Sequence, residues 1–235
     1  MSRYKAIDCH GLVLPIMLLI SSQALAVEDV ATASNMQHHT CNWLIEVKRT
    51  NTWLERDQRE RIKMGELFLT AKKNGTAVNQ EERKAISERM HATDAILQGE
   101  LEDLVARCGW PTTTEFGDKA PQYAATIVQH ASLEFQLKYE PLMRASANAN
   151  ELPKRLWATL DDRIRVRKNL PQRYGTQLKT DGPELTLWPI EDEEHLDERR
   201  AEVDMVPVPI CAYLGMFDQP IKYKKCEWGA PVTAP

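Results

Sequence analysis

Two predicted helices of nearly equal length, each with a cysteine at its outer end, constrain the fold more than any other feature of this sequence. The hydrophobic pattern is helical over Cys41–Lys73, and Asn79 is a typical N-cap for a second helix that ends at Cys108. Residues 73–76, Lys-Asn-Gly-Thr, form the turn between them. Helices joined by a short turn run antiparallel, so we expect a hairpin about 45 Å long, at about 1.5 Å per residue.

The same geometry predicts the disulfides. Cys9 lies in an N-terminal leader, which leaves four cysteines in the mature chain. An antiparallel hairpin brings Cys41 next to Cys108, and Cys211 then pairs with Cys226. Free buried thiols are the alternative. No CxxC sequence occurs, so the chain has neither a thioredoxin-like redox motif nor the cysteine spacing of a zinc ribbon.

Residues 1–26 are typical of a secretory signal peptide, with a basic start, an apolar run and a small-residue cleavage site at 24–26. The apolar run, residues 11–20, is shorter than the roughly 20 residues that a transmembrane helix needs, although an uncleaved anchor is an alternative. No later segment is apolar enough to span a membrane. We therefore expect a periplasmic or secreted protein, in a compartment where disulfides persist.

The mature chain is expected to form one mainly α domain over residues 41–228. Residues 27–40 are polar and patternless, which predicts a flexible N-terminal lead, and residues 229–235 are expected to be a loose tail. His38-His39 in the lead is compatible with a copper or nickel site. Two adjacent histidines cannot supply a full ligand set, which favours a mobile polar terminus. We expect no metal and no cofactor.

Shorter helices follow the predicted hairpin. The pattern indicates one helix over residues 118–139, with Pro141 ending or kinking it, and another over 152–167. A charged, exposed helix is expected over 191–203, followed by a loop-like, proline-rich tail.

The residue pattern changes from helical to strand-like between the helices predicted over 152–167 and 191–203. Two short strands, 174–179 and 184–188, flank the turn sequence Asp181-Gly182 and predict a β-hairpin. The fold class is therefore mainly α: a long antiparallel helical hairpin packed on shorter helices, with a small β-hairpin in the C-terminal third.

Polar residues occupy predicted core positions in the first helix. Its inward stripe, spaced by alternating three- and four-residue steps, is Leu44, Val47, Asn51, Leu54, Gln58, Arg61 and Gly65. Buried polar groups are costly unless they are paired, so Gln58 and Arg61 indicate either an internal network or the lining of a ligand site. Asp57 is one helical turn from Arg61 and is a candidate partner for it.

Later helices carry further candidates. His130 borders an apolar face and is either a satisfied residue at the edge of the core or a general acid or base. Its neighbour Gln129 is a ligand-binding candidate that would orient a ligand or a water. Asp162 is a candidate to orient that base, and Arg163, which points towards apolar neighbours, is a candidate to hold an anion. Pairing of Arg61 with Asp162 or with a glutamate is the structural alternative.

The stretch after Pro171 gathers groups that bind ligands well. It places two amides, a phenol, a hydroxyl and a glycine within six residues, and loops on rigid scaffolds often carry sites. The ligand-binding candidates in it are Gln172, Tyr174, Thr176 and Gln177.

Taken in order, five short motifs resemble an uncharacterised, mostly bacterial family defined as a domain of unknown function. They are Asp57-Gln58-x-x-Arg61, Gly109-Trp110-Pro111, Gln129-His130-Ala131, Asp162-Arg163-Ile164 and Gln172-x-Tyr174-Gly175-Thr176-Gln177. The resemblance covers roughly residues 42–213. It implies that these positions belong to one shared site, and it implies no activity.

Composition narrows the classes of function. The formal net charge is −4, which gives no electrostatic reason to expect nucleic acid or an anionic membrane surface as a partner. GxSxG, Walker A, GxGxxG and HExxH motifs are absent from the sequence, so no covalent nucleophile or nucleotide fold is indicated.

Three hypotheses for function follow. The first is an exported hydrolase acting on an anionic substrate, with His130 and Asp162 as catalytic residues and Arg61 and Arg163 holding the anion. The second is a non-catalytic envelope binding module, such as a ligand sensor or an inhibitor of a partner protein. The third is a satisfied internal network with function elsewhere. The expected partner is a small anionic ligand or an envelope component, and the sequence does not identify a protein partner.

Overall fold

The computed structural model describes residues 41–181, 184–217 and 221–226. The predicted signal peptide (1–26), the lead (27–40), Gly182 of the predicted turn and the tail (229–235) lie outside these described residues. No helix in the described part of the chain is long and apolar enough to cross a membrane.

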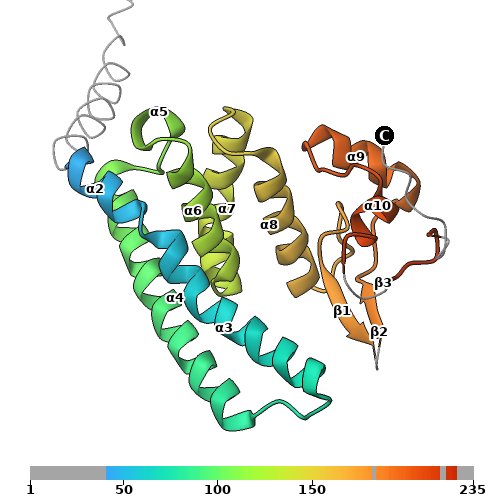
Figure 1. Ribbon diagram of the computed structural model, residues 1–235. Helices are drawn as coiled ribbons and strands as arrows, with labels where there is room; N and C mark the ends of the chain where they lie inside the picture. The colour runs from blue at the N-terminus through green and yellow to red at the C-terminus, as the bar shows by residue number, and fades with distance from the viewer. Residues whose placement is uncertain (1–40, 182–183, 218–220, 227–235) are drawn as a thin grey trace, which may run out of the picture.

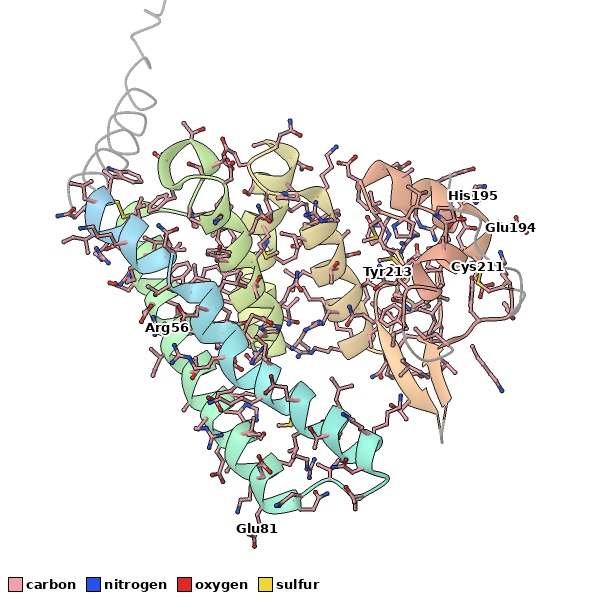
Figure 2. All side chains as sticks on the ribbon, in the orientation of Figure 1. Arg56, Glu81, Glu194, His195, Cys211 and Tyr213 are labelled. Atoms are coloured by element: carbon pink, nitrogen blue, oxygen red, sulfur yellow. A yellow bond between two sulfur atoms is a disulfide. The ribbon has the colours of Figure 1, made fainter. Side chains whose placement is uncertain are left out.

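The long hairpin is confirmed. It consists of α2 (Trp43–Thr50), α3 (Trp53–Asn74) and α4 (Gln80–Cys108), so a short break at residues 51–52 divides the first predicted helix. Gly75 ends α3 in the left-handed conformation, with φ of 62°, and the side chain of Asn79 caps α4. Figure 1 shows α3 and α4 running beyond the ends of the shorter helices, and Figure 2 shows Glu81 at the far end of the hairpin.

The inward stripe predicted for the first helix is wrong by one residue. Leu44 is 80% exposed, whereas the buried positions of α2 and α3 that face inward are Glu46, Thr50, Trp53, Asp57 and Glu60. These residues keep the alternating four- and three-residue spacing of a helix face. The hydrophobic pattern misplaces the face because it treats carboxylates as surface residues, and here arginines of the hairpin neutralise them, as Arg107 does for Glu46 at 2.7 Å.

The single helix predicted over 118–139 is also corrected. After the short α5 (Thr113–Phe116), the structure has α6 (Lys119–His130), an extended residue, Ala131, and then α7 (Leu133–Asn148). Ser132 starts α7 because its hydroxyl accepts the N–H of Phe135. The helical chain therefore restarts at a serine N-cap two residues after His130.

Pro141 does not end this helical segment, so the first of the two predicted alternatives, an end or a kink, is wrong. It lies inside α7, and the helix continues to Asn148. Buried Tyr139 and Met143 flank the proline and pack into the main core, so tertiary packing outweighs the lost backbone hydrogen bond.

The main core lies between the hairpin and three shorter helices. The last of these, α8 (Lys154–Arg167), matches its predicted position. Fully buried side chains from five helices meet there: Trp53, Leu97, Leu101, Leu104, Val128, Met143 and Leu160. Figure 1 shows α6, α7 and α8 side by side, with the hairpin on one side and the strands on the other.

A small sheet unit follows α8. Strand β1 (Leu178–Asp181) pairs antiparallel with β2 (Glu184–Leu187), which confirms a hairpin, although β1 begins four residues later than expected. The tail adds two elements that were not predicted: α10 (Ile210–Leu214) and β3 (Ile221–Lys222), which runs parallel to β2. Their buried side chains form a second, smaller core.

The charged helix expected over 191–203 forms as a 3₁₀ turn (Glu193–His195) and α9 (Leu196–Glu202). It is not simply exposed, because Leu196 and Arg200 are buried. The guanidinium of Arg200 donates to the carbonyls of Tyr174, Pro207 and Val208, which satisfies its buried charge.

Both predicted disulfides are present. Cys41 pairs with Cys108 at the open end of the helical hairpin, with Cα atoms 5.0 Å apart. Cys211 pairs with Cys226 at the edge of the small sheet unit, where Figure 2 labels Cys211. One crosslink therefore closes each of the two cores.

Candidate functional site

His130 is the last residue of α6, and its imidazole contacts a buried carboxylate. Its Nδ1 lies 2.8 Å from Oδ1 of Asp57, a residue of α3 that is 3% exposed. The imidazole side chain itself is 23% exposed, so it borders both core and solvent. This pair joins the first helical hairpin to the end of α6.

The contact defines the tautomer of the ring. Nδ1 lies within hydrogen-bond distance of an acceptor, Asp57 Oδ1 at 2.8 Å, and of a donor, Arg61 Nε at 3.1 Å, and it can serve only one of them. The contact with the carboxylate is the shorter one, and a carboxylate oxygen only accepts, so it favours the proton on Nδ1. Nε2 then carries the lone pair, and no partner for it occurs among the described residues. A histidine held in this way can take a proton from a water or a substrate at Nε2.

Arg61 lies against the same imidazole. Its Nε is 3.1 Å from His130 Nδ1, and its Nη2 is 2.8 Å from Asp94 Oδ1 and 3.6 Å from Asp57 Oδ1. The third nitrogen, Nη1, is buried and has no acceptor among the described residues. Two carboxylates thus hold the guanidinium in place without using all of its N–H groups.

The break between α6 and α7 supplies acceptors for a second group of side chains. A helix end leaves carbonyls without intrahelical partners. The carbonyl of Gln129 accepts from Arg163 Nη1 at 2.8 Å and from Gln136 Nε2 at 2.9 Å, and the carbonyl of Ala131 accepts from Arg167. Cations at a helix C-terminus also interact well with its dipole.

Arg163 has an unusual electrostatic environment. Burial lowers the pKa of its guanidinium, and the positive charges of Arg167 and Arg61 lower it further. No described carboxylate pairs with Arg163 or with Arg167, and Arg163 Nε is buried without an acceptor. Three arginines, Arg61, Arg163 and Arg167, therefore lie near the end of α6, where two carboxylates, those of Asp57 on α3 and Asp94 on α4, balance only part of their charge.

Two predicted ligand-binding residues in this region bond to the protein itself. Gln58 Nε2 donates to Asp57 Oδ2 at 2.6 Å, which helps to fix that carboxylate. The side chain of Gln129 donates to the carbonyl of Leu156 on α8, so only its backbone carbonyl faces the arginines.

Asp162 lies in a separate cluster. Its fully buried carboxylate accepts from the backbone N–H groups of Arg173, Tyr174 and Thr176 and from the hydroxyl of Thr176, at 2.6–3.2 Å. All its hydrogen bonds go to this loop, and none goes to His130. The carboxylate beside the imidazole is Asp57, so the structure gives Asp162 a different geometric position from the one expected.

The rest of the 172–177 motif builds the same loop. Gln172 bonds to the backbone of Gln177 and Trp188, and the amide of Gln177 donates to Thr176. Gly175 has φ of 73°, and a Cβ there would lie 2.9 Å from Ile210, so the position requires glycine. These contacts connect α8 to the sheet unit.

The structure thus divides the predicted site into two groups. It brings together Asp57, Gln58, Arg61, the backbone of Gln129, His130 and Arg163, and it places Asp162, Gln172, Tyr174, Thr176 and Gln177 in the loop cluster.

Sequence analysis did not identify three residues of the first group: Asp94, Gln136 and Arg167. Asp94 follows Thr93 on the inner side of the second helix, and an inward Arg61 demands a carboxylate, so a search of that helix for an acid would have found it. Gln136 and Arg167 depend on the break after His130, which the prediction of one continuous helix concealed.

The described residues contain no group of three or more His, Cys, Asp or Glu side chains that could hold a metal ion. The groups gathered around His130 are one imidazole, one orienting carboxylate and two arginines with unused N–H groups.

Comparison with known proteins agrees with the expected family. A model for a family of unknown function, DUF6624, matches residues 57–224. The chain belongs to this family. The matched region begins at Asp57 and contains both residue groups described above. No curated protein and no solved structure matches the chain.

Proposed function

We propose that the protein is an exported hydrolase that acts on an anionic substrate, with His130 as the general base. The observation that carries the proposal is the 2.8 Å contact between Asp57 and His130, which leaves Nε2 free to accept a proton. General acid–base catalysis by a positioned histidine contributes about 10²–10⁴-fold to a rate.

The remaining residues of the site have roles in this proposal. Asp57 holds the tautomer of His130 and stabilises the imidazolium that forms when Nε2 takes a proton from water. Arg61 and Arg163 bind the anionic group and stabilise negative charge that develops as the water attacks. Gln58 and Asp94 position Asp57 and Arg61. Asp162 holds the loop and takes no part in the proton transfer.

Export is supported by the N-terminal sequence of residues 1–26 and by the two disulfides, which persist in oxidising compartments. A periplasmic or secreted protein meets small anionic molecules and envelope components, which is the substrate class proposed here.

The test is turnover of chromogenic esters by the mature protein. The panel contains p-nitrophenyl phosphate, bis-p-nitrophenyl phosphate, p-nitrophenyl sulfate and p-nitrophenyl acetate. We expect hydrolysis of at least one anionic ester and a loss of about 10²-fold or more in His130→Asn. His91→Asn, an exposed histidine of α4, is the matched control and should keep full activity. If no ester is hydrolysed faster by the wild type than by His130→Asn, the proposal fails.

Anion binding without chemistry is the second candidate function. It is favoured by the buried N–H groups of Arg61 and Arg163, which need an acceptor but do not need a base. A protein that binds anions and hydrolyses none of the four esters belongs to this class.

A further inference from the structure

Three buried polar atoms near the end of α6 have no hydrogen-bond partner in the part of the chain that the structure describes. They are Nη1 of Arg61, Nε of Arg163 and Oε1 of Gln136. Leaving a buried donor or acceptor unpaired costs about 1–3 kcal/mol, and more for a charged group. Three such atoms around one helix end indicate that something other than the protein completes their hydrogen bonds.

These atoms come from neighbouring side chains. Arg163 and Gln136 donate to the same carbonyl oxygen, that of Gln129. Arg61 contacts the ring of His130, the next residue, and its charge is among those that lower the pKa of Arg163. Three helices, α3, α7 and α8, thus direct polar groups to the carbonyl end of α6.

The donor and acceptor types of these three atoms indicate what kind of ligand would bind to them. Two guanidinium N–H groups need acceptors, and the excess positive charge favours an anion. Gln136 is fully buried, and its nitrogen must face the carbonyl of Gln129, so the unpaired atom is an oxygen that needs a donor. An anion that also carries an O–H matches all three atoms and the excess positive charge.

We propose that Arg61, Arg163 and Gln136 form a receptor for a protonated phosphate group, either inorganic phosphate or the phosphate of a monoester. This inference rests on the proposed function, because it names the anionic group of the substrate. A phosphate monoester offers several acceptor oxygens and, below its second ionisation near pH 6, one hydroxyl donor, and inorganic phosphate keeps at least one hydroxyl at that pH. A carboxylate or a sulfate has acceptors alone at that pH and leaves Gln136 Oε1 unpaired.

The discriminating experiment compares the affinity of the protein for phosphate with its affinity for sulfate. Isothermal titration calorimetry at pH 6 would measure binding of inorganic phosphate and of sulfate to the mature protein. Sulfate carries the larger negative charge at this pH, so electrostatics alone would favour it. We expect phosphate to bind at least tenfold more tightly than sulfate, because only phosphate can donate to Gln136.

Two variants test the named residues. Arg163→Gln should weaken phosphate binding at least tenfold, whereas Arg155→Gln, an exposed position on the same helix with the same change of charge, should leave it within twofold. Gln136→Met should bring phosphate binding down to the level of sulfate and leave sulfate binding unchanged. Retained sulfate binding shows that this buried variant is folded, because a structural defect would weaken the binding of both anions.

Each outcome separates this inference from the proposed function. Equal binding of phosphate and sulfate, or unchanged phosphate binding in Arg163→Gln, overturns the phosphate receptor even if His130-dependent turnover of another ester stands. Selective phosphate binding without hydrolysis of any ester supports the receptor and overturns the hydrolase.

Discussion

Two buried aspartates show how one residue type serves two purposes in this protein. Asp57 uses one oxygen for His130 and the other for Gln58, so it orients a group that is partly open to solvent. Asp162 uses both oxygens for backbone N–H groups of one loop. Burial raises the pKa of the Asp162 carboxyl, and the hydrogen bonds from that loop oppose the shift. Asp57 therefore orients a side chain of the candidate site, whereas Asp162 holds the backbone of a loop in place.

Asp162→Asn should therefore destabilise the protein strongly. An amide NH₂ would face N–H donors of Tyr174 and Thr176 that now point at an oxygen, and we expect a loss of about 3–5 kcal/mol in the free energy of unfolding. Urea unfolding would measure it. Asp161→Asn is the matched control, because Asp161 has one buried oxygen without a partner, and burial and the charge of Asp162 raise its pKa. Equal stability of the two variants would contradict the assigned role of Asp162.

For single residues, the sequence predicts which side chains belong to the candidate site better than it predicts which groups those side chains contact. Arg61, His130 and Arg163 could be chosen because polar groups at or beside core positions are costly, and Asp57 because it lies one helical turn from Arg61. Their partners depend on contacts between distant segments. The pairing of His130 with Asp57, across 73 positions of sequence, and not with Asp162, is such a contact.

The α3–α4 hairpin is held by ion pairs as well as by apolar packing. Glu100 accepts from the indole of Trp53 and from both terminal nitrogens of Arg56, which Figure 2 labels on α3. Hydrogen bonds from Lys63 and Arg89 lower the pKa of Glu60, and those from Arg107 and Arg49 lower the pKa of Asp103. For Glu100, burial raises the pKa, but hydrogen bonds from Arg56 and Trp53 outweigh it and the pKa is lowered.

These shifts predict how the stability of the hairpin depends on pH. A carboxyl whose pKa is lowered in the folded state binds more protons when unfolded, so its contribution is present above the ordinary values, 4.5 for glutamate and 3.8 for aspartate, and is lost as the pH falls through the lowered values. We expect the free energy of unfolding, measured with urea, to decrease as the pH falls below about 5.

Glu100→Gln isolates this effect. It should cost about 2 kcal/mol at neutral pH, through the charged hydrogen bonds to Arg56, and should flatten the decrease at low pH. Glu88→Gln, an exposed glutamate of the same helix, is the control and should change neither quantity appreciably. An unchanged acid profile in Glu100→Gln would show that this pair does not contribute to the pH dependence.

Element boundaries explain the larger differences from the sequence-based prediction. The hairpin and α8 could be predicted because their apolar spacing and caps agree. The break after Ala131 was missed because apolar residues on both sides continue a helical spacing, although Ser132 is a good N-cap. The elements α10 and β3 lie in a proline-rich segment whose local preference favours loop, and they form because their side chains fill the second core.

At the scale of the whole molecule, two cores are each closed by one disulfide, and the candidate site belongs to only one of them. The Cys41–Cys108 bond closes a segment of sequence separation 67, around the main core that contains α3, α4 and α6. The Cys211–Cys226 bond closes a separation of 15 beside the small sheet. The residues around His130 come from α3, α4, α6, α7 and α8, none of which belongs to the sheet unit.

Removing each disulfide should therefore give different results. From the entropy of closing the two loops, replacing both cysteines by alanine should cost about 4 kcal/mol for Cys41–Cys108 and about 3 kcal/mol for Cys211–Cys226. The second variant should keep ester turnover and phosphate affinity at temperatures where it remains folded, because its site elements are still crosslinked. Urea unfolding, with calorimetric phosphate titration of both folded variants, would measure this. If loss of Cys211–Cys226 abolishes phosphate binding in a folded protein, the site depends on the sheet unit and its assignment to the helical core is wrong.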